Sequence, residues 1–392
     1  MPTIDESRLE TTLDALLARV ESTMAATGEE FPLYAHPNTG EWETTPDGDW
    51  CGGHWIGLLW LASRHASGER SRRFSECARD HMDTVHNYLP RSSMFYGMAH
   101  DYAGFRAYDI TGDRRLFGFG LDGADAMVES FHEGARQVPL GDLAIRGPEN
   151  FRGPESDHGP SGTRVGAVDS VYTALPVLWR AYRETGDARF RDVAVSHADK
   201  HLDWYVRPDG STWHHAVFDP ETGNLERQYN ELAHSDETCW ARGQGWNVAG
   251  LARAYQETGA RRYLDVLEQT VAYYVEESPP DLVANWDFAA PQGPGTPRDT
   301  SAAALVAYGL VRLDAGSAPS EHAERVVDLR RTGEQILESL LTDYLITEPD
   351  DDRYGMVKHG CYNYPGGFAT DNELVWTDYY VMKAVSTLLE EW

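Results

Sequence analysis

The chain has 392 residues, and 41% of them are hydrophobic, which is enough for one large core. Acidic residues outnumber basic ones by 63 to 34, and the net charge of −29 argues against nucleic acid and anionic membranes as partners because their phosphates would repel the protein. The chain holds only three lysines, and its acidic residues are dispersed rather than gathered in a tail, a composition that favours a salt-rich, halophilic cytoplasm.

The cysteines and the N-terminus indicate the compartment. The four cysteines lie far apart and form no C-x-x-C pair, which argues against a zinc site and against a disulfide framework. The first residues, MPTIDESRLETTLDALLARV, carry acids where a signal peptide needs a basic region, and no apolar run approaches the length of a membrane span. We therefore expect a cytoplasmic protein without a metal, a cofactor or a membrane contact.

A repeated unit dominates the chain: an apolar helical stretch, a turn that contains glycine, and an amphipathic helical stretch. Its clearest copies read LWLASRHASGERSRRF, FRAYDITGDRRLF, LWRAYRETGDARFRDVA and LARAYQETGARRYLDVL. The turn glycines Gly68, Gly112, Gly186 and Gly259 are each expected to cap the C-terminus of the first helix. Each unit is thus predicted to be a helical hairpin.

Twelve helices follow from this pattern. Six mostly apolar helices are expected near 52–66, 100–111, 168–185, 241–258, 300–314 and 374–391. Six amphipathic partners are expected near 6–27, 69–88, 113–134, 187–205, 260–277 and 319–343. Because only the apolar set can be buried on most faces, the sequence predicts an all-α fold, an (α/α)6 barrel with an inner and an outer ring. We expect residues 1–392 to form a single catalytic domain.

One segment departs from the helical pattern. Residues 204–228 hold two turn signals, Pro-Asp-Gly and Thr-Gly-Asn, among alternating residues, and we expect a short β-hairpin there. The segments 140–163 and 286–298 are rich in glycine and proline and are expected to be long loops, which in compact domains are often functional.

Unusual polar and aromatic residues gather where the inner helices are expected to begin. Since inner helices of such a barrel run the same way, their N-termini should meet at one rim and form a pocket. The residues concerned include Trp55, His100, Asp101, Asp169, Trp240, Arg242, Gln244, Trp246 and Asp299. An Asp before a helix is commonly only an N-cap, and tryptophans at helical spacing are commonly core. His214 and His215, in the hairpin, are equally consistent with exposed strand positions and with ligand contacts.

A pair of carboxylates at this rim would have a chemical consequence. Neighbouring like charges disfavour double ionisation, so Asp101 and Asp169 facing one pocket would raise the pKa of one of them. The protonated member would meet the requirement for general acid catalysis on a glycoside or an enol ether.

From Trp55 to the C-terminus the chain resembles glycoside hydrolase family 88, the unsaturated glucuronyl hydrolases. The resemblance rests on W-x-G-x-L-W-L-A from Trp55, H-D-x-x-G-F from His100, a proline-containing stretch from Asp169 to Trp179, D-x-[ST]-x-W-A-R-G-Q-x-W from Asp236, D-[ST]-S-A-A-A from Asp299 and H-G-x-Y from His359 to Tyr362. The W-A-R-G-Q-x-W string together with H-D and V-D at these separations is the specific part of the match.

The resemblance implies an (α/α)6 barrel and metal-free hydration of the C4=C5 double bond of a terminal unsaturated uronate. It makes Asp169 the general acid/base and Asp101 the second acid, which positions the substrate. Substrate-binding positions are implied for Trp55, His100, Arg242, Gln244, Trp246, His359, Tyr362 and one of His214 and His215. The partner is then a small unsaturated oligosaccharide, bound by a monomer or a homodimer.

The sequence departs from the family pattern at one position, and two other functions stay open. Family members often carry Q-G-x-[SA]-D before W-A-R-G-Q, whereas this chain has Leu232 in place of the glutamine, which puts the preferred uronate and leaving sugar in question. The alternatives are an unsaturated rhamnogalacturonyl hydrolase, which shares barrel and mechanism, and a sugar epimerase or isomerase that uses paired pocket histidines.

Overall fold

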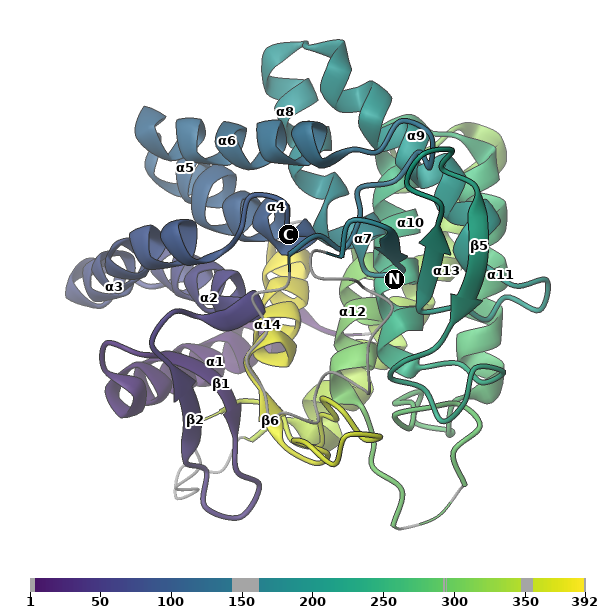
Figure 1. Ribbon diagram of the computed structural model, residues 1–392. Helices are drawn as coiled ribbons and strands as arrows, with labels where there is room; N and C mark the ends of the chain where they lie inside the picture. The colour runs from purple at the N-terminus through teal and green to yellow at the C-terminus, as the bar shows by residue number, and fades with distance from the viewer. Residues whose placement is uncertain (1–3, 143–161, 292, 294, 347–354, 391–392) are drawn as a thin grey trace.

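The computed structural model describes residues 4–142, 162–291, 293, 295–346 and 355–390, and within them two sets of helices alternate along the chain (Figure 1). The inner set is α2 (Gly52–His65), α4 (Met94–His100) continued by α5 (Arg106–Thr111), α7 (Ser170–Thr173) continued by α8 (Leu175–Thr185), α10 (Ala241–Thr258), α12 (Thr300–Val311) and α14 (Val375–Leu389). The outer set is α1 (Glu6–Thr27), α3 (Gly68–Tyr88), α6 (Arg114–Ser130), α9 (Ala188–Tyr205), α11 (Arg261–Glu277) and α13 (Ala323–Ser339).

The inner helices form a closed ring. Helix α2 packs against α4, α4 against α7 and α8, α7 against α10, α10 against α12, α12 against α14, and α14 against α2. Each outer helix covers an inner one, as α3 covers α2, α11 covers α10 and α13 covers α12. The architecture is the (α/α)6 barrel that the sequence predicts.

Burial follows the two sequence patterns. Every residue of α12 is buried, whereas α3 buries a single stripe that includes Phe74, Ala78 and Met82. Small residues bring inner helices together: a Cβ at Gly250 would lie 2.3 Å from a methyl of Val171, so only glycine allows α10 to approach α7 this closely.

The predicted glycine caps are confirmed at three turns. Gly112, Gly186 and Gly259 follow α5, α8 and α10 in the left-handed conformation, with φ of 69°, 72° and 63°. The prediction for Gly68 is wrong, because α2 ends at His65 and Gly68 is the first residue of α3.

The second inner helix begins earlier than predicted. Ser93 caps it, accepting a hydrogen bond from the backbone N–H of Phe95, and α4 starts at Met94 instead of near residue 100. The segment Asp101–Phe105 is then a π-helical turn, which places one extra residue in the helix before α5. His100 and Asp101 therefore lie within the helix, below the rim, rather than at its start.

Two small antiparallel sheets flank the helices on different sides in Figure 1. The predicted hairpin is confirmed as β4 (His215–Phe218) and β5 (Leu225–Tyr229), and β3 (Val165–Ala167) adds a third strand beside β4. The other sheet, β1 (Phe31–Ala35), β2 (Trp42–Thr45) and β6 (Glu373–Leu374), was not predicted from the sequence. Most of the predicted loop 140–163 lies outside the described residues, and the described part of 286–298, which omits 292 and 294, is irregular as expected.

Two further findings concern the cysteines and the length of the apolar helices. Cys51, Cys77, Cys239 and Cys361 are all free thiols. Among the helices that the structure describes, none is both long and apolar enough to cross a membrane.

Candidate active site

Asp169 lies between the end of strand β3 and the start of helix α7. It occupies the N-cap position, yet its side chain makes no capping hydrogen bond. Asp113 and Asp187 occupy the same position before outer helices α6 and α9, and their carboxylates do cap, each accepting a backbone N–H two residues on. The capping explanation therefore fits Asp113 and Asp187 but not Asp169.

The Asp169 carboxyl is buried, and its pKa lies near neutral pH. The residue is 8% exposed, and its Oδ1 atom has no hydrogen-bond partner in the described part of the chain. Burial raises the pKa of this carboxyl to about 7, against the smaller opposing effects of the Arg242 charge and of a backbone hydrogen bond. From the sequence we expected the charge of Asp101 to raise the pKa of Asp169, whereas in the structure burial raises it.

Arg242, on the first turn of α10, is fixed by its own contacts. Its Nη1 donates to Asp299 Oδ2 at 2.9 Å and to the Cys361 carbonyl at 2.5 Å, and its Nη2 donates to the Tyr362 carbonyl at 2.6 Å. The guanidinium also lies 4.6 Å from the ring centre of Trp240. These bonds orient a buried positive charge, but they also use much of the hydrogen-bonding fork with which Arg242, an expected substrate-binding residue, could hold a uronate carboxylate.

His214, at the start of the hairpin, lies close to Asp169 and Trp240. The backbone N–H of Val168 donates to the His214 carbonyl at 2.8 Å, so the residue before Asp169 is tied directly to His214. The His214 ring lies 4.6 Å from Trp240 and stacks on His215 at 3.6 Å. His215 in turn bonds Glu231 at 3.1 Å, which leaves His214 as the member of the pair beside the Trp240 ring.

Aromatic side chains next to Arg242 form a wall that the sequence motifs identified only in part. Tyr362 accepts a hydrogen bond from the Trp50 indole at 2.6 Å, and Trp376 lies 4.9 Å from Trp50 and 4.8 Å from Tyr362. Sugar rings stack on such faces. Trp50 precedes α2 within an acidic, glycine-containing turn, and this position at a helix start is the signal that could have found it.

Asp101 faces a different set of charges. It is 3% exposed, and its Oδ2 lies 3.9 Å from Arg106 Nε on the turn below. Its negative charge also acts on Lys383, which lies further along α14. The structure thus places Asp101 in the barrel interior on the π-helical turn.

His100 lies between an inner and an outer helix instead of in the pocket. Its ring stacks between Tyr96 and Phe119, at 3.8 Å and 4.3 Å, and it is fully buried. In the described residues, His86, His100 and Asp122 are the group with ligand atoms close enough to hold a metal ion. Arg91 and the Tyr96 hydroxyl already bind the two oxygens of Asp122.

Three further predicted site residues are buried elsewhere. Gln244 donates from Nε2 to the carbonyls of Gly210 and Thr270, which anchors α10 to its surroundings instead of facing the rim. Trp55 is fully buried within α2. Trp246 lies deeper in the barrel than Arg242, with its ring 5.7 Å from Tyr380 and 5.8 Å from Tyr172.

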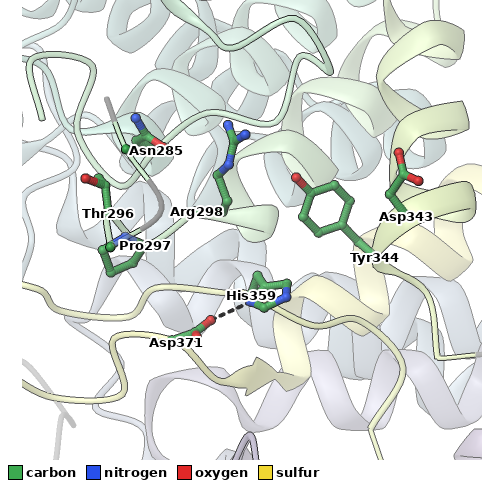
Figure 2. Close-up of a pocket in the computed structure, with 10 residues that line it drawn as sticks. Asn285, Thr296, Pro297, Arg298, Asp343, Tyr344, His359 and Asp371 are labelled. Atoms are coloured by element: carbon green, nitrogen blue, oxygen red, sulfur yellow. Dashed lines mark hydrogen bonds and ion pairs between the residues drawn. The ribbon is translucent and has the colours of Figure 1, made fainter. Parts of the chain in front are cut away.

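His359 lines a separate cleft, shown in Figure 2. This cleft has a volume of about 610 Å³, and Asn285, Thr296, Arg298, Tyr344 and Asp371 are among its lining residues. His359 is half exposed and pairs with Asp371 at 2.7 Å. The two ends of the H-G-x-Y motif therefore lie in different places: His359 lines this cleft, and Tyr362 belongs to the aromatic wall beside Arg242.

At the rim of the barrel, a carboxyl with a pKa of about 7, a fixed arginine and aromatic rings meet the chemical requirements for acid catalysis on a glycoside or an enol ether, the chemistry of glycoside hydrolases. The family model for Glycosyl Hydrolase Family 88 matches residues 167–388, more than half of the chain. The chain belongs to this family.

Known relatives match this chain along nearly its full length. The unsaturated glucuronyl hydrolase of Bacillus sp. strain GL1 is 28% identical over 373 residues, covering 92% of this chain and 91% of the relative. The unsaturated chondroitin disaccharide hydrolase of Streptococcus agalactiae serotype III is 27% identical over 380 residues, covering 93% and 87%. The crystal structure of the Bacillus enzyme superposes with a TM-score of 0.84 at 25% identity, covering 97% and 96% of the two chains.

Proposed function

We propose that this enzyme removes a terminal 4,5-unsaturated uronic acid from small oligosaccharides by hydrating the C4=C5 double bond. The observation that carries the proposal is the state of Asp169, a carboxyl that does not cap its helix and whose pKa burial raises to about 7. Such a group can give up a proton and take one back near neutral pH. The names of the relatives, which act on unsaturated glucuronyl and chondroitin substrates, support the same substrate class.

Asp169 carries both proton transfers in this mechanism. The protonated carboxyl gives its proton to C4 of the enol ether, and positive charge develops at C5 and on the ring oxygen. The carboxylate that results takes a proton from water as the water oxygen bonds to C5. The hemiketal at C5 then opens to a ketone and leaves a hemiacetal at C1. Collapse of this hemiacetal to an aldehyde breaks the glycosidic bond and releases the shortened sugar and a keto uronic acid.

Binding falls to the residues around Asp169. Trp50 and Tyr362 offer ring faces to the sugar, with the fully buried Trp376 packed against both, and His214 offers a ring nitrogen close to Trp240. The Arg242 guanidinium, held by Asp299, supplies a fixed positive charge for the substrate carboxylate. We assign Asp101 the supporting role of a negative charge deeper in the barrel that helps to orient the sugar.

The test is turnover of a panel of lyase-generated unsaturated disaccharides, which includes glucuronyl, chondroitin and rhamnogalacturonyl members. Each reaction is followed by loss of the C4=C5 ultraviolet absorbance and by release of the shortened sugar. We expect the two signals to appear in equal amounts for glucuronyl or chondroitin members. Sugar release on the rhamnogalacturonyl member alone would contradict the proposed substrate, and no loss of absorbance on any member would contradict the reaction.

A further inference from the structure

A second cavity lies at the end of the barrel away from Asp169. It has a volume of about 220 Å³, and the C-terminal parts of the inner helices α2, α5 and α14 and the end of α12 line it. Its polar lining includes Arg64, Arg106, Tyr308, Arg312 and Lys383. We call it the basal cavity.

The basal cavity concentrates positive charge in a strongly acidic chain. The two acidic residues of its lining are already paired, since Asp109 binds Arg180 through both oxygens and Glu390 binds Arg64 at 3.1 Å. Arg312 and Lys383 have no acidic partner within ion-pair distance among the described residues. For a protein with a net charge of −29, two cations that face one cavity without an ion-pair partner are conspicuous.

Lys383 is the informative member of this group. It is 6% exposed, and its Nζ makes no hydrogen bond with the described residues. The rings of Tyr102, Tyr308 and Tyr379 surround this nitrogen at 4.5 Å, 4.6 Å and 4.7 Å. These rings offer cation–π contact, but the three N–H donors of an ammonium need lone pairs as well. Helix dipoles explain an arginine at the end of α12, but Lys383 sits in the middle of α14.

The pKa shifts of the neighbouring groups reflect the same positive charge. Burial lowers the pKa of Lys383 to about 7; the Tyr308 hydroxyl and the Asp101 carboxylate oppose this shift, and the charges of Arg106 and Arg312 add to it. Burial alone would raise the pKa of the Tyr308 hydroxyl, yet the charges of Arg312, Lys383 and Arg106 together lower it. An anion between these groups would favour the charged form of Lys383 and offset its repulsion by the two arginines.

We propose that the basal cavity binds one small inorganic oxyanion, such as sulfate or phosphate, between Arg312, Lys383 and Arg106. The guanidinium fork of Arg312 matches two oxygens of a tetrahedral anion, and the Lys383 ammonium supplies further donors. The cavity volume accommodates an ion of this size. Because Arg106 and Lys383 also act on Asp101, the bound anion would neutralise charges that face the barrel interior.

The experiment measures thermal unfolding and calorimetric binding with the full-length protein. Sulfate or phosphate replaces chloride at constant ionic strength, and glycerol 3-phosphate serves as an organic phosphate monoester. We expect a saturable rise in Tm and one binding site for inorganic sulfate or phosphate, because a ligand that binds the folded state stabilises it. Arg312→Gln and Lys383→Met should each weaken the affinity at least tenfold.

The matched control is Arg261→Gln, which removes an exposed arginine paired with Asp265 on the outer helix α11. It should bind sulfate as the wild type does. Lys383 is buried, so Lys383→Met could fail to fold. Arg312 is partly exposed, so Arg312→Gln leaves the core intact and still tests the proposal in that case. Equal binding by the wild type and Arg312→Gln would overturn the proposal. Binding of glycerol 3-phosphate without binding of inorganic phosphate would overturn it as well.

Discussion

Replacement of Asp169 by asparagine should stabilise the protein, and the gain should grow with pH. The folded-state pKa of about 7 lies well above the value of 3.8 for an unperturbed aspartate. Between these two pH values the folded protein holds a proton that the unfolded chain has lost, so the stability of the wild type falls as pH rises from about 4 to 7. The asparagine side chain is neutral at every pH and carries no such penalty.

The magnitude follows from the size of the shift. A pKa difference of one unit corresponds to about 1.4 kcal/mol, so the full penalty above pH 7 is roughly 4 kcal/mol. Between pH 5 and pH 8.5 the stability difference between Asp169→Asn and the wild type should widen by about 3 kcal/mol. For a chain of 392 residues this corresponds to a Tm difference that widens by about 3–4 °C.

The assay is thermal unfolding of both proteins at several pH values and one salt concentration. Asp187→Asn is the matched control, because Asp187 caps α9 and the hydrogen bonds of Arg189 lower the pKa of its exposed carboxyl. This control should be less stable than the wild type wherever Asp187 is ionised. A gap between Asp169→Asn and the wild type that stays constant or narrows as pH rises would refute the reasoning.

Three further outcomes follow from the same structure. The kcat/KM of the wild type should fall about tenfold per pH unit above pH 7, as the Asp169 proton is lost, which a pH–rate profile measures. Trp50→Phe removes the hydrogen bond to Tyr362 and should raise KM several-fold in steady-state kinetics while kcat changes little. Gln244→Ala leaves two buried backbone carbonyls without a donor and should cost about 2–3 kcal/mol in urea unfolding, with KM unchanged.

Periodicity was sufficient to predict the barrel because its two helix types differ in composition over their whole length. α12 is apolar on every face and α3 on one, and glycines such as Gly186 end the helices where expected. The start of α4 was not predictable from the same signals. Its signal is the N-cap residue Ser93 before an apolar turn, not a glycine or a long helical period, because α4 has only seven residues. The π-helical turn at Asp101 depends on packing that a single sequence does not encode locally.

For the site, the sequence identified which residues matter better than where each one points. A motif such as W-A-R-G-Q fixes the spacing along α10, but helix rotation decides that Arg242 faces Asp299 whereas Gln244 turns to the backbone of Gly210. The same limit applies to His359, whose backbone adopts a positive φ of 64° and directs it to the cleft of Figure 2. The position of Asp169 at a helix start was visible in the sequence, but its role as the general acid/base came from the family resemblance, because an Asp at a helix start is commonly only an N-cap.

The most direct test of the catalytic role of Asp169 compares the loss of C4=C5 absorbance by the wild type, Asp169→Asn and Asp187→Asn on one unsaturated disaccharide that the wild type turns over. We expect Asp169→Asn, although folded and more stable, to lose at least a thousandfold in kcat, because the asparagine amide cannot give a proton to C4. Asp187→Asn should keep wild-type kcat. Activity of Asp169→Asn within tenfold of the wild type would contradict the assignment of Asp169 as the general acid.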